Sequence, residues 1–434
     1  MPRSPSTPGK EPRKPASAEI AEPLLAWFAR NQRALPWRTS PRDPYRTWLA
    51  EVMLQQTRVD VVVPYWLRFV ARHPSLRALA EAPEGDVLAL WSGLGYYARA
   101  RNLHRAAQAV LRDFGGALPR TSALLAGLPG FGPYTAAAVA SLAFGEQVAL
   151  VDGNVARVLA RLLRLQGDAA RVRSLAWTEA RALLPKARAG PFNEALMELG
   201  ATVCTPRAPD CARCPLSTSC RSFPIGDAED FPARTQRKER PLLRWAAVAL
   251  RRDDGALLLA RRPADSLFAG LWDLPSAALP ASTASASPPR SAPAIDPAAR
   301  PSGAGAARPR RSAPLFDEAV ARTTALSALA AVSTRRSGAG IPASRAGPPA
   351  GKLARQLELT FAGAVAQTLT HREVEVAVLL ARPNGSARAT ALLRSCFPEG
   401  ETLRWTAPTA DALRKLGLSS LARKCLRAAG IDWG

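Results

Sequence analysis

The sequence lacks any long uninterrupted apolar stretch. No apolar run in the 434 residues approaches the roughly 20 residues that a membrane-spanning helix needs. Met1 is followed by Pro, Ser and Lys rather than by the apolar core of a secretion signal. We therefore expect a cytoplasmic protein without a membrane partner.

Acidic residues are scarce relative to basic ones. The chain has 59 Lys and Arg residues against 35 Asp and Glu, which gives a formal net charge of +24. Such an excess favours a polyanionic partner, and nucleic acid first of all. The alternative is compositional, because Arg is used heavily throughout the chain and part of its charge is then only solvated surface. Charge alone does not decide between the two.

Cysteine is also infrequent, but it is unevenly placed. Of the six cysteines, four follow the pattern Cys204-x6-Cys211-x2-Cys214-x5-Cys220. In a reducing compartment such a cluster indicates a metal site rather than disulfides. Four thiolates in one short run can close around a 4Fe–4S cluster. Structural zinc is the main alternative, although zinc sites usually use two C-x2-C pairs and only one is present here.

The pattern of apolar residues predicts two folded parts. Residues 1–18 are rich in Pro, Ser and basic residues and are expected to be a disordered basic arm. Residues 19–226 carry helical periodicity throughout, which predicts an all-α domain that includes the cysteine loop. Residues 227–243 form a polar, basic linker.

Residues 244–434 change to strand patterning and predict a smaller α+β domain. Trp245–Leu250 and Ala256–Arg261 are expected to form a hairpin around Asp253-Asp254-Gly255. Residues 276–314 are of low complexity and are expected to be a disordered insertion. Ala410–Ala429 is expected to be one helix.

The stretch Leu128-Pro129-Gly130-Phe131-Gly132-Pro133-Tyr134 predicts a tight join between two helices. Gly130 and Gly132 permit left-handed backbone angles and a close approach to a ligand. The N–H groups that open the second helix would face outward and suit one phosphate oxygen, without carrying base information.

Two acidic residues are candidates for chemistry. Glu51 sits in an otherwise apolar helix, and Asp152 follows the strand-like run that ends at Val151. A lone Glu is most often a partly exposed helix carboxylate. The functional hypothesis is that Glu51 is a buried carboxyl that still donates a proton near neutral pH. Paired with Asp152 it matches the logic of glycoside hydrolysis, with one acid for the leaving group and one anion for the cationic sugar.

Several motifs together resemble MutY-type adenine DNA glycosylases, a helix-hairpin-helix, iron–sulfur family that removes adenine mispaired with 8-oxoguanine. The resemblance covers about residues 20–275 and resumes near residue 355. The motifs are Trp37-Arg38, Glu51–Thr57, Gly93–Arg99, Leu128–Tyr134, Asp152–Val155 and the cysteine run.

The resemblance implies a role for each matching residue. Glu51 would protonate adenine at N7, and Asp152 would stabilise the oxocarbenium ion, with Tyr134 supporting Asp152 and Asn154 positioning the groups beside it. Other residues would bind the DNA: Arg38 and Glu198 would line the pocket of the flipped adenine, Gln56 and Tyr96 would enter the duplex as wedges, and Leu128, Gly130 and Gly132 would form the hairpin. The family carries a 4Fe–4S cluster, which the four cysteines would bind.

Position 134 separates two related activities. Glycosylase/lyases of the endonuclease III kind carry a Lys there, whose amine forms a Schiff base with the sugar. Tyr134 cannot form an imine, so the resemblance predicts a monofunctional glycosylase. The alternatives are a bifunctional lyase and a catalytically inactive DNA-binding protein, and the presence of both Glu51 and Asp152 argues against the latter.

The second domain resembles the Nudix-like (MutT-like) C-terminal domain of the family through Ala260–Pro263 and Gly270–Pro275. The glutamate-rich helix of active Nudix hydrolases is absent from the sequence, so diphosphate hydrolysis is not expected. In the family a Ser-His pair after an aromatic residue senses 8-oxoguanine, and here Leu369-Thr370-His371 stands at that place. The expected partner is duplex DNA with adenine opposite 8-oxoguanine or guanine, bound by a monomer.

Overall fold

The computed structural model describes residues 15–233, 239–263, 265–280, 316–334, 350–432 of the chain. These residues form two compact units, divided between Lys238 and Glu239. The basic arm predicted for residues 1–18 lies mostly outside the described residues, as does the insertion predicted for residues 276–314 from residue 281 on. No helix in the described ranges is long and apolar enough to cross a membrane.

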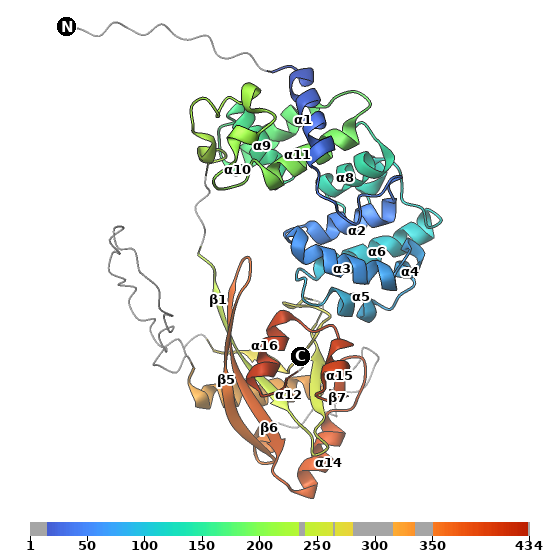
Figure 1. Ribbon diagram of the computed structural model, residues 1–434. Helices are drawn as coiled ribbons and strands as arrows, with labels where there is room; N and C mark the ends of the chain where they lie inside the picture. The colour runs from blue at the N-terminus through green and yellow to red at the C-terminus, as the bar shows by residue number, and fades with distance from the viewer. Residues whose placement is uncertain (1–14, 234–238, 264, 281–315, 335–349, 433–434) are drawn as a thin grey trace, which may run out of the picture. The chain divides into compact units, whose positions relative to one another are not determined.

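The first unit is built from α-helices and short 3-10 turns, which confirms the prediction of a helical N-terminal half (Figure 1). Its helices are α1 Ser17–Asn31, α2 Pro44–Leu54, α3 Val59–Arg72, α4 Leu76–Ala80, α5 Glu84–Trp91, α6 Ala98–Asp113, α7 Ser122–Leu125, α8 Pro133–Phe144, α9 Gly153–Leu163, α10 Ala169–Leu183 and α11 Ala189–Thr202, followed by the 3-10 turns η1 Cys211–Arg213, η2 Ser217–Ser219 and η3 Ala228–Asp230.

Several of these helices begin where a short polar side chain accepts a hydrogen bond from an otherwise unpaired backbone N–H group. Asp43 caps α2, Asp152 caps α9 and Asp168 caps α10 in this way. The strand-like run before Asp152 does not form a strand. Leu150 and Val151 have no regular secondary structure and are buried in the core formed by α1, α8, α9, α10 and α11.

The second unit contains two sheets, of order β4-β1-β6-β5 and β3-β2-β7. The strands are β1 Leu242–Leu250, β2 Leu257–Arg261, β3 Trp272–Asp273, β4 Ser276–Ala278, β5 Leu357–Thr368, β6 Glu373–Pro383 and β7 Leu403–Thr406, and the helices are α12 Glu318–Thr334, α13 Ala350–Ala354, α14 Ala387–Cys396, α15 Ala410–Arg414 and α16 Ser420–Ala428.

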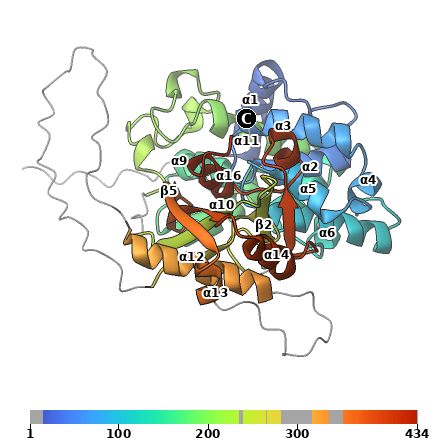
Figure 2. The same ribbon diagram turned by 90° about the horizontal axis from the view of Figure 1, so that it is seen from below.

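Helices cover both faces of the four-stranded sheet, as Figure 2 shows from below. Alternate residues of β1 point to opposite faces. Ala246 and Val248 pack with the α12 side, whereas Ala247 and Ala249 pack with α16. The predicted α+β content of this unit is therefore present.

Three details of the second unit differ from the sequence prediction. The turn at Gly255 forms, with a φ of 83°, but β1 and β2 enter different sheets, because β1 pairs in parallel with β6 along its whole length. Ser276–Ala278 is strand β4, paired with β1, so it is not part of an insertion. The predicted helix Ala410–Ala429 is broken into α15 and α16 around Gly417.

We predict that Leu159→Ala lowers the free energy of unfolding of the first unit by about 2–5 kcal/mol, because it leaves a cavity in a packed core. Leu159 is fully buried in α9. The matched control Leu124→Ala removes the same atoms from a side chain that is 55% exposed and should cost less than about 0.5 kcal/mol. Denaturant titration of the whole chain measures both, and equal losses would contradict the packing described here.

Candidate active site

The turn between α7 and α8 needs glycine at one of its two positions. Gly130 has a φ of +79°, and a Cβ atom there would lie 2.6 Å from the Cβ of Asn102. Gly132, in contrast, caps α8 with an ordinary φ of −80°, and an added Cβ would meet nothing. The prediction that both glycines serve left-handed angles was therefore wrong for Gly132. Leu128 is buried, so that its side chain packs in the core.

Glu51 is buried in α2, with 6% of its surface exposed. Its Oε2 atom accepts a hydrogen bond of 2.5 Å from the hydroxyl of Tyr134. Burial raises the pKa of Glu51 to about 7, the Tyr134 hydrogen bond opposes this rise, and the charges of Glu194 and Asp152 add to it. Glu51 is thus not a partly exposed helix carboxylate but a buried group whose raised pKa favours the protonated form more than that of an exposed glutamate.

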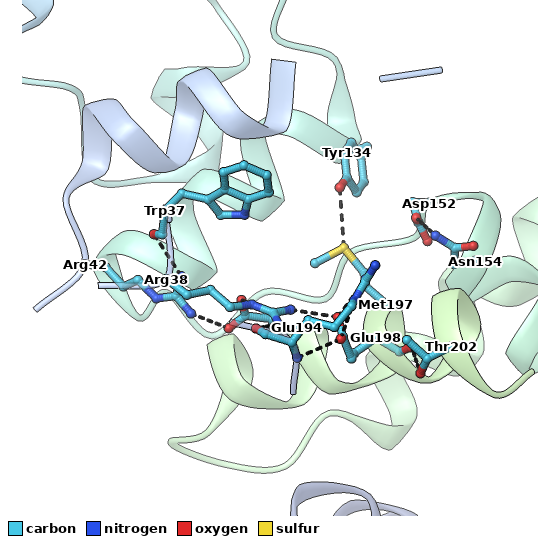
Figure 3. Close-up of polar contacts among 11 residues, drawn as sticks. Trp37, Arg38, Arg42, Tyr134, Asp152, Asn154, Glu194, Met197, Glu198 and Thr202 are labelled. Carbon is cyan, nitrogen blue, oxygen red and sulfur yellow. Dashed lines mark hydrogen bonds and ion pairs between the residues drawn. The ribbon is translucent and has the colours of Figure 1, made fainter. Parts of the chain in front are cut away.

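Tyr134 lies at the start of α8 and joins this helix to α2. Its hydroxyl donates to Glu51. The same hydroxyl lies 3.4 Å from the sulfur of Met197 (Figure 3). The charge of Asp152 also acts on Tyr134, and the predicted support of Asp152 by Tyr134 stays a prediction. Burial raises the pKa of Tyr134 well above its usual value, and the charges of Glu51 and Asp152 add to the rise, so the phenol stays a proton donor.

Asp152 shares its two oxygens between the backbone and a side chain. Oδ1 accepts from the Val155 N–H at 2.7 Å, and Oδ2 accepts from the Asn154 amide at 2.9 Å. Burial raises the pKa of Asp152, whereas these two hydrogen bonds lower it. The charge of Asp152 also raises the pKa of Glu51, so the two carboxyls interact electrostatically.

Arg157 connects Asn154 to the cysteine loop, and the sequence prediction did not include it. Its guanidinium donates to Asn154 Oδ1 at 2.9 Å, to the Gly200 carbonyl at 2.8 Å and to the Cys204 carbonyl at 2.9 Å. A Cβ atom at Gly200 would lie 2.6 Å from the Cβ of Asn154, so this glycine permits the close packing of α9 on α11. The position of Arg157, three residues after Asn154 on one helix face, was the available signal.

Arg38 and Glu198 lie together in a buried ion-pair network (Figure 3). Arg38 donates to Glu194 at 2.7 Å and to Glu198 at 2.9 Å. Glu198 is 1% exposed, and its oxygens also accept from Arg33, which lowers its pKa against the effect of burial. Arg42 donates to the other oxygen of Glu194 at 2.6 Å. The sequence prediction missed Arg33, Glu194 and Arg42, although Glu194 and Glu198 stand four residues apart on α11 and therefore share one face.

Gln56 and Tyr96 lie in two turns at helix ends. Gln56 follows α2 with a φ of 57°, and Tyr96 precedes α6 with a φ of 50°. Both side chains are exposed. Such left-handed angles are unusual for residues other than glycine, so the surrounding structure must hold both turns.

The four cysteines line one cavity with Arg161. In the described part of the chain no three Cys, His, Asp or Glu side chains converge closely enough for a single metal ion. The Arg161 guanidinium lies 3.4 Å from the Cys204 sulfur, and burial raises the pKa of Cys214 to about 12. A thiolate at Cys214 therefore needs a nearby positive charge, as a metal cluster supplies. Of the remaining cysteines, Cys425 is buried in the core of the second unit, whereas Cys396 is only partly buried.

In the second unit, Thr370 and His371 lie at the turn that joins β5 to β6. Both are exposed, and the turn is closed by a 2.8 Å hydrogen bond from the Leu369 N–H to the Arg372 carbonyl. The Thr370 carbonyl accepts from Arg240 at 3.1 Å. Leu369 is partly buried and packs against the core cluster that includes the buried residues of α16.

Comparison of the chain with known proteins identifies related DNA repair proteins. Residues 49–181 match the family model of the HhH-GPD superfamily base excision DNA repair proteins. The chain is 38% identical to the mouse adenine DNA glycosylase over 309 residues, which are 59% of this chain and 60% of that protein. It is 35% identical to the Schizosaccharomyces pombe adenine DNA glycosylase over 319 residues, covering 59% of this chain and 68% of that protein.

The chain therefore belongs to the adenine DNA glycosylase family. It is also 45% identical to the Mycobacterium tuberculosis adenine DNA glycosylase over 195 residues, covering 44% of this chain and 64% of that protein. A solved structure of a thermostable thymine-DNA glycosylase is 30% identical and covers 48% of this chain and 97% of its own, with a TM-score of 0.44. The chain spans about 60% of the length of the mouse protein.

We predict that Arg38→Met costs about 1.5–3 kcal/mol of unfolding free energy at pH 7, because two buried carboxylates each lose one of their two cationic partners. The deficit should shrink as the pH falls from about 7 to about 5, because Arg38 helps to lower the pKa of Glu198, so this carboxyl takes up a proton at higher pH in the variant. Denaturant titrations at both pH values test this. The control Arg112→Met breaks an exposed pair with Asp113 and should leave the stability nearly unchanged at either pH, because water screens such a pair. A pH-independent deficit would contradict the network's role.

Proposed function

We propose that the protein is a monofunctional adenine DNA glycosylase that hydrolyses the N-glycosidic bond of adenine mispaired with 8-oxoguanine or guanine. The observation that carries this proposal is the buried Glu51, with a pKa of about 7, next to Tyr134 and within the field of Asp152. Family membership adds the expectation of base excision in DNA repair.

In the proposed reaction the carboxyl of Glu51 donates its proton to N7 of the extruded adenine. The bond between C1′ and N9 then breaks, and its electron pair leaves with the base, which is a better leaving group once protonated. A carboxyl whose pKa matches the working pH is suited to this step, since it holds a proton and can also release it.

The positive charge left on the sugar is stabilised by ionised Asp152. The amide of Asn154 and the N–H of Val155 hold this carboxylate in one orientation and favour its charged form. Water then adds to C1′, and its proton returns Glu51 to the acid form. This is the division of labour between two carboxyls that glycoside hydrolysis uses.

We propose that DNA is bound chiefly through its phosphates. The N–H groups at the start of α8 have no acceptor within the helix and lie beside the turn at Gly130, which suits a phosphate oxygen. Gln56 and Tyr96 would enter the duplex where the base has left the stack, and Arg38 with Glu198 would support the base pocket. The net charge of +24 implies strongly salt-dependent binding.

Two further parts belong to the same proposal. The four cysteines would bind a 4Fe–4S cluster, which would shape the loop that Arg157 joins to Asn154. The second unit would be a Nudix-like domain that recognises 8-oxoguanine through the turn carrying Thr370 and His371. Leu369 stands where the family has an aromatic residue, so its contribution there would be a packing contact.

The experiment that tests the proposal is single-turnover adenine release from a duplex with adenine opposite 8-oxoguanine. Glu51→Gln keeps the side chain's shape but cannot protonate the base, so the rate constant should fall at least about a hundredfold, with duplex affinity nearly unchanged. The control Glu81→Gln changes an exposed carboxylate paired with Arg77 and should leave the rate unchanged. Full activity in Glu51→Gln would refute the role of Glu51, and efficient borohydride trapping would favour the bifunctional lyase.

The pH dependence supplies a second prediction. The rate constant should decline as the pH rises through about 7, because Glu51 must be protonated to act and its pKa is about 7. Tyr134→Phe removes a hydrogen bond that favours the ionised carboxylate, so the alkaline limb should move up by about one pH unit. Tyr65→Phe, which loses a bond to the Ser92 carbonyl, should not move it. A limb that stays in place in Tyr134→Phe would contradict the assignment.

A further inference from the structure

One guanidinium lies between the two turns that carry Gln56 and Tyr96. Arg99, in the first turn of α6, is 9% exposed. Its Nη1 atom lies 2.5–3.0 Å from the carbonyl oxygens of Val52, Met53 and Gln55. The neighbouring Nη2 atom donates to Thr57 Oγ1 at 3.1 Å and to the carbonyls of Gly95 at 3.2 Å and Leu94 at 3.4 Å.

These contacts have a clear physical basis on the side of α2. The last carbonyls of a helix have no partner within it and carry the negative end of the helix dipole. Arg99 places a positive charge and several N–H donors against the carbonyls at the end of α2. It therefore ends the helix where Gln56 must take a left-handed conformation.

The side of Tyr96 is held by the same group. The Arg99 guanidinium stacks on the ring of Tyr96 at 5.2 Å and on that of Trp91 at 5.4 Å. The indole of Trp91 in turn donates to the Gly95 carbonyl at 3.0 Å. A cation over an aromatic face is an attractive contact, so Arg99 fixes both the backbone before Tyr96 and its ring.

The two turns are also tied to the hairpin. The side-chain amide of Gln55 donates to Thr135 Oγ1 at 3.0 Å, one residue after Tyr134. Arg99 and Gly130 line one small cavity with Trp48 and Asn102. The Arg99 side chain, which contacts both turns, thus lines the same cavity as the Gly130 turn that is proposed to bind phosphate.

We propose that Arg99 is a positioning residue that couples the Gln56 turn to the Tyr96 turn, so that both side chains enter the duplex together. We call the contacts of Arg99 with both turns the Arg99 bracket. The use of Gln56 and Tyr96 as wedges rests on the proposed function, whereas the bracket itself does not. Lysine cannot replace Arg99, because an ammonium is a compact point charge without the planar fork of donors that reaches both turns.

The test is a double-mutant cycle in single-turnover adenine release. In the wild-type background, the combined effect of Gln56→Ala and Tyr96→Ala should differ from the product of the single effects by at least about threefold. In the Arg99→Lys background the two effects should simply multiply. Multiplicative effects in the wild type, or coupling that survives in Arg99→Lys, would overturn the proposal.

A second measurement separates this proposal from the proposed function. Amide hydrogen exchange needs no activity, and the Thr57 and Leu94 amides are hydrogen-bonded within the two turns. Exchange in both turns should accelerate together in Arg99→Lys, and acceleration in one turn only, or in neither, would overturn the bracket. Arg112→Lys, at the far end of α6, should exchange like the wild type. If the wild-type protein releases no adenine, the proposed function is refuted, and the exchange result still tests the bracket.

A milder pair of variants applies if Arg99→Lys does not fold. Thr57→Val removes the hydroxyl that accepts from Arg99 but keeps the side chain's shape. It should accelerate exchange in the Gln56 turn and reduce the coupling between Gln56 and Tyr96, whereas Thr57→Ser should restore both. Unchanged coupling in Thr57→Val would count against the bracket.

Discussion

The hydrogen bond between Tyr134 and Glu51 joins the two helices on which the site depends. Burying a carboxyl in α2 raises the free energy of its charged form, and the 2.5 Å bond from the hydroxyl partly offsets that cost. Because Tyr134 opens α8, the same bond fixes the hairpin turn relative to α2. A change in the packing of either helix therefore alters the proton affinity of Glu51.

Asp152 has a structural role in addition to the one that the proposed mechanism gives it. As the N-cap of α9 it accepts a backbone hydrogen bond that starts the helix, and this bond also favours its ionised form. Asn154 and Arg157 extend these contacts to the carbonyl of Cys204. The cysteine loop and the carboxylate thus share a continuous chain of hydrogen bonds, and movement of the loop is expected to change the orientation of Asp152.

How much the sequence predicted depended on whether a feature was local. The helical first unit and the turn at Gly130 follow from periodicity and from a backbone angle that only glycine takes easily. The partner of Tyr134 could not be predicted, because α2 and α8 meet only through tertiary packing. The Gly255 turn was predicted correctly because it depends on local sequence. The sheet that each flanking strand enters was not predicted, because it depends on pairing between distant strands.

Glu51 is expected to hold a proton near neutral pH in the folded, DNA-free protein. A titration of the whole protein carrying ¹³C-labelled glutamate, followed by NMR, measures this, with Glu51→Gln used to assign the resonance. The expected pKa of Glu51 is about 7. A value near the ordinary pKa of glutamate, about 4.3, would contradict it, because the carboxyl would then be ionised and unable to protonate a base.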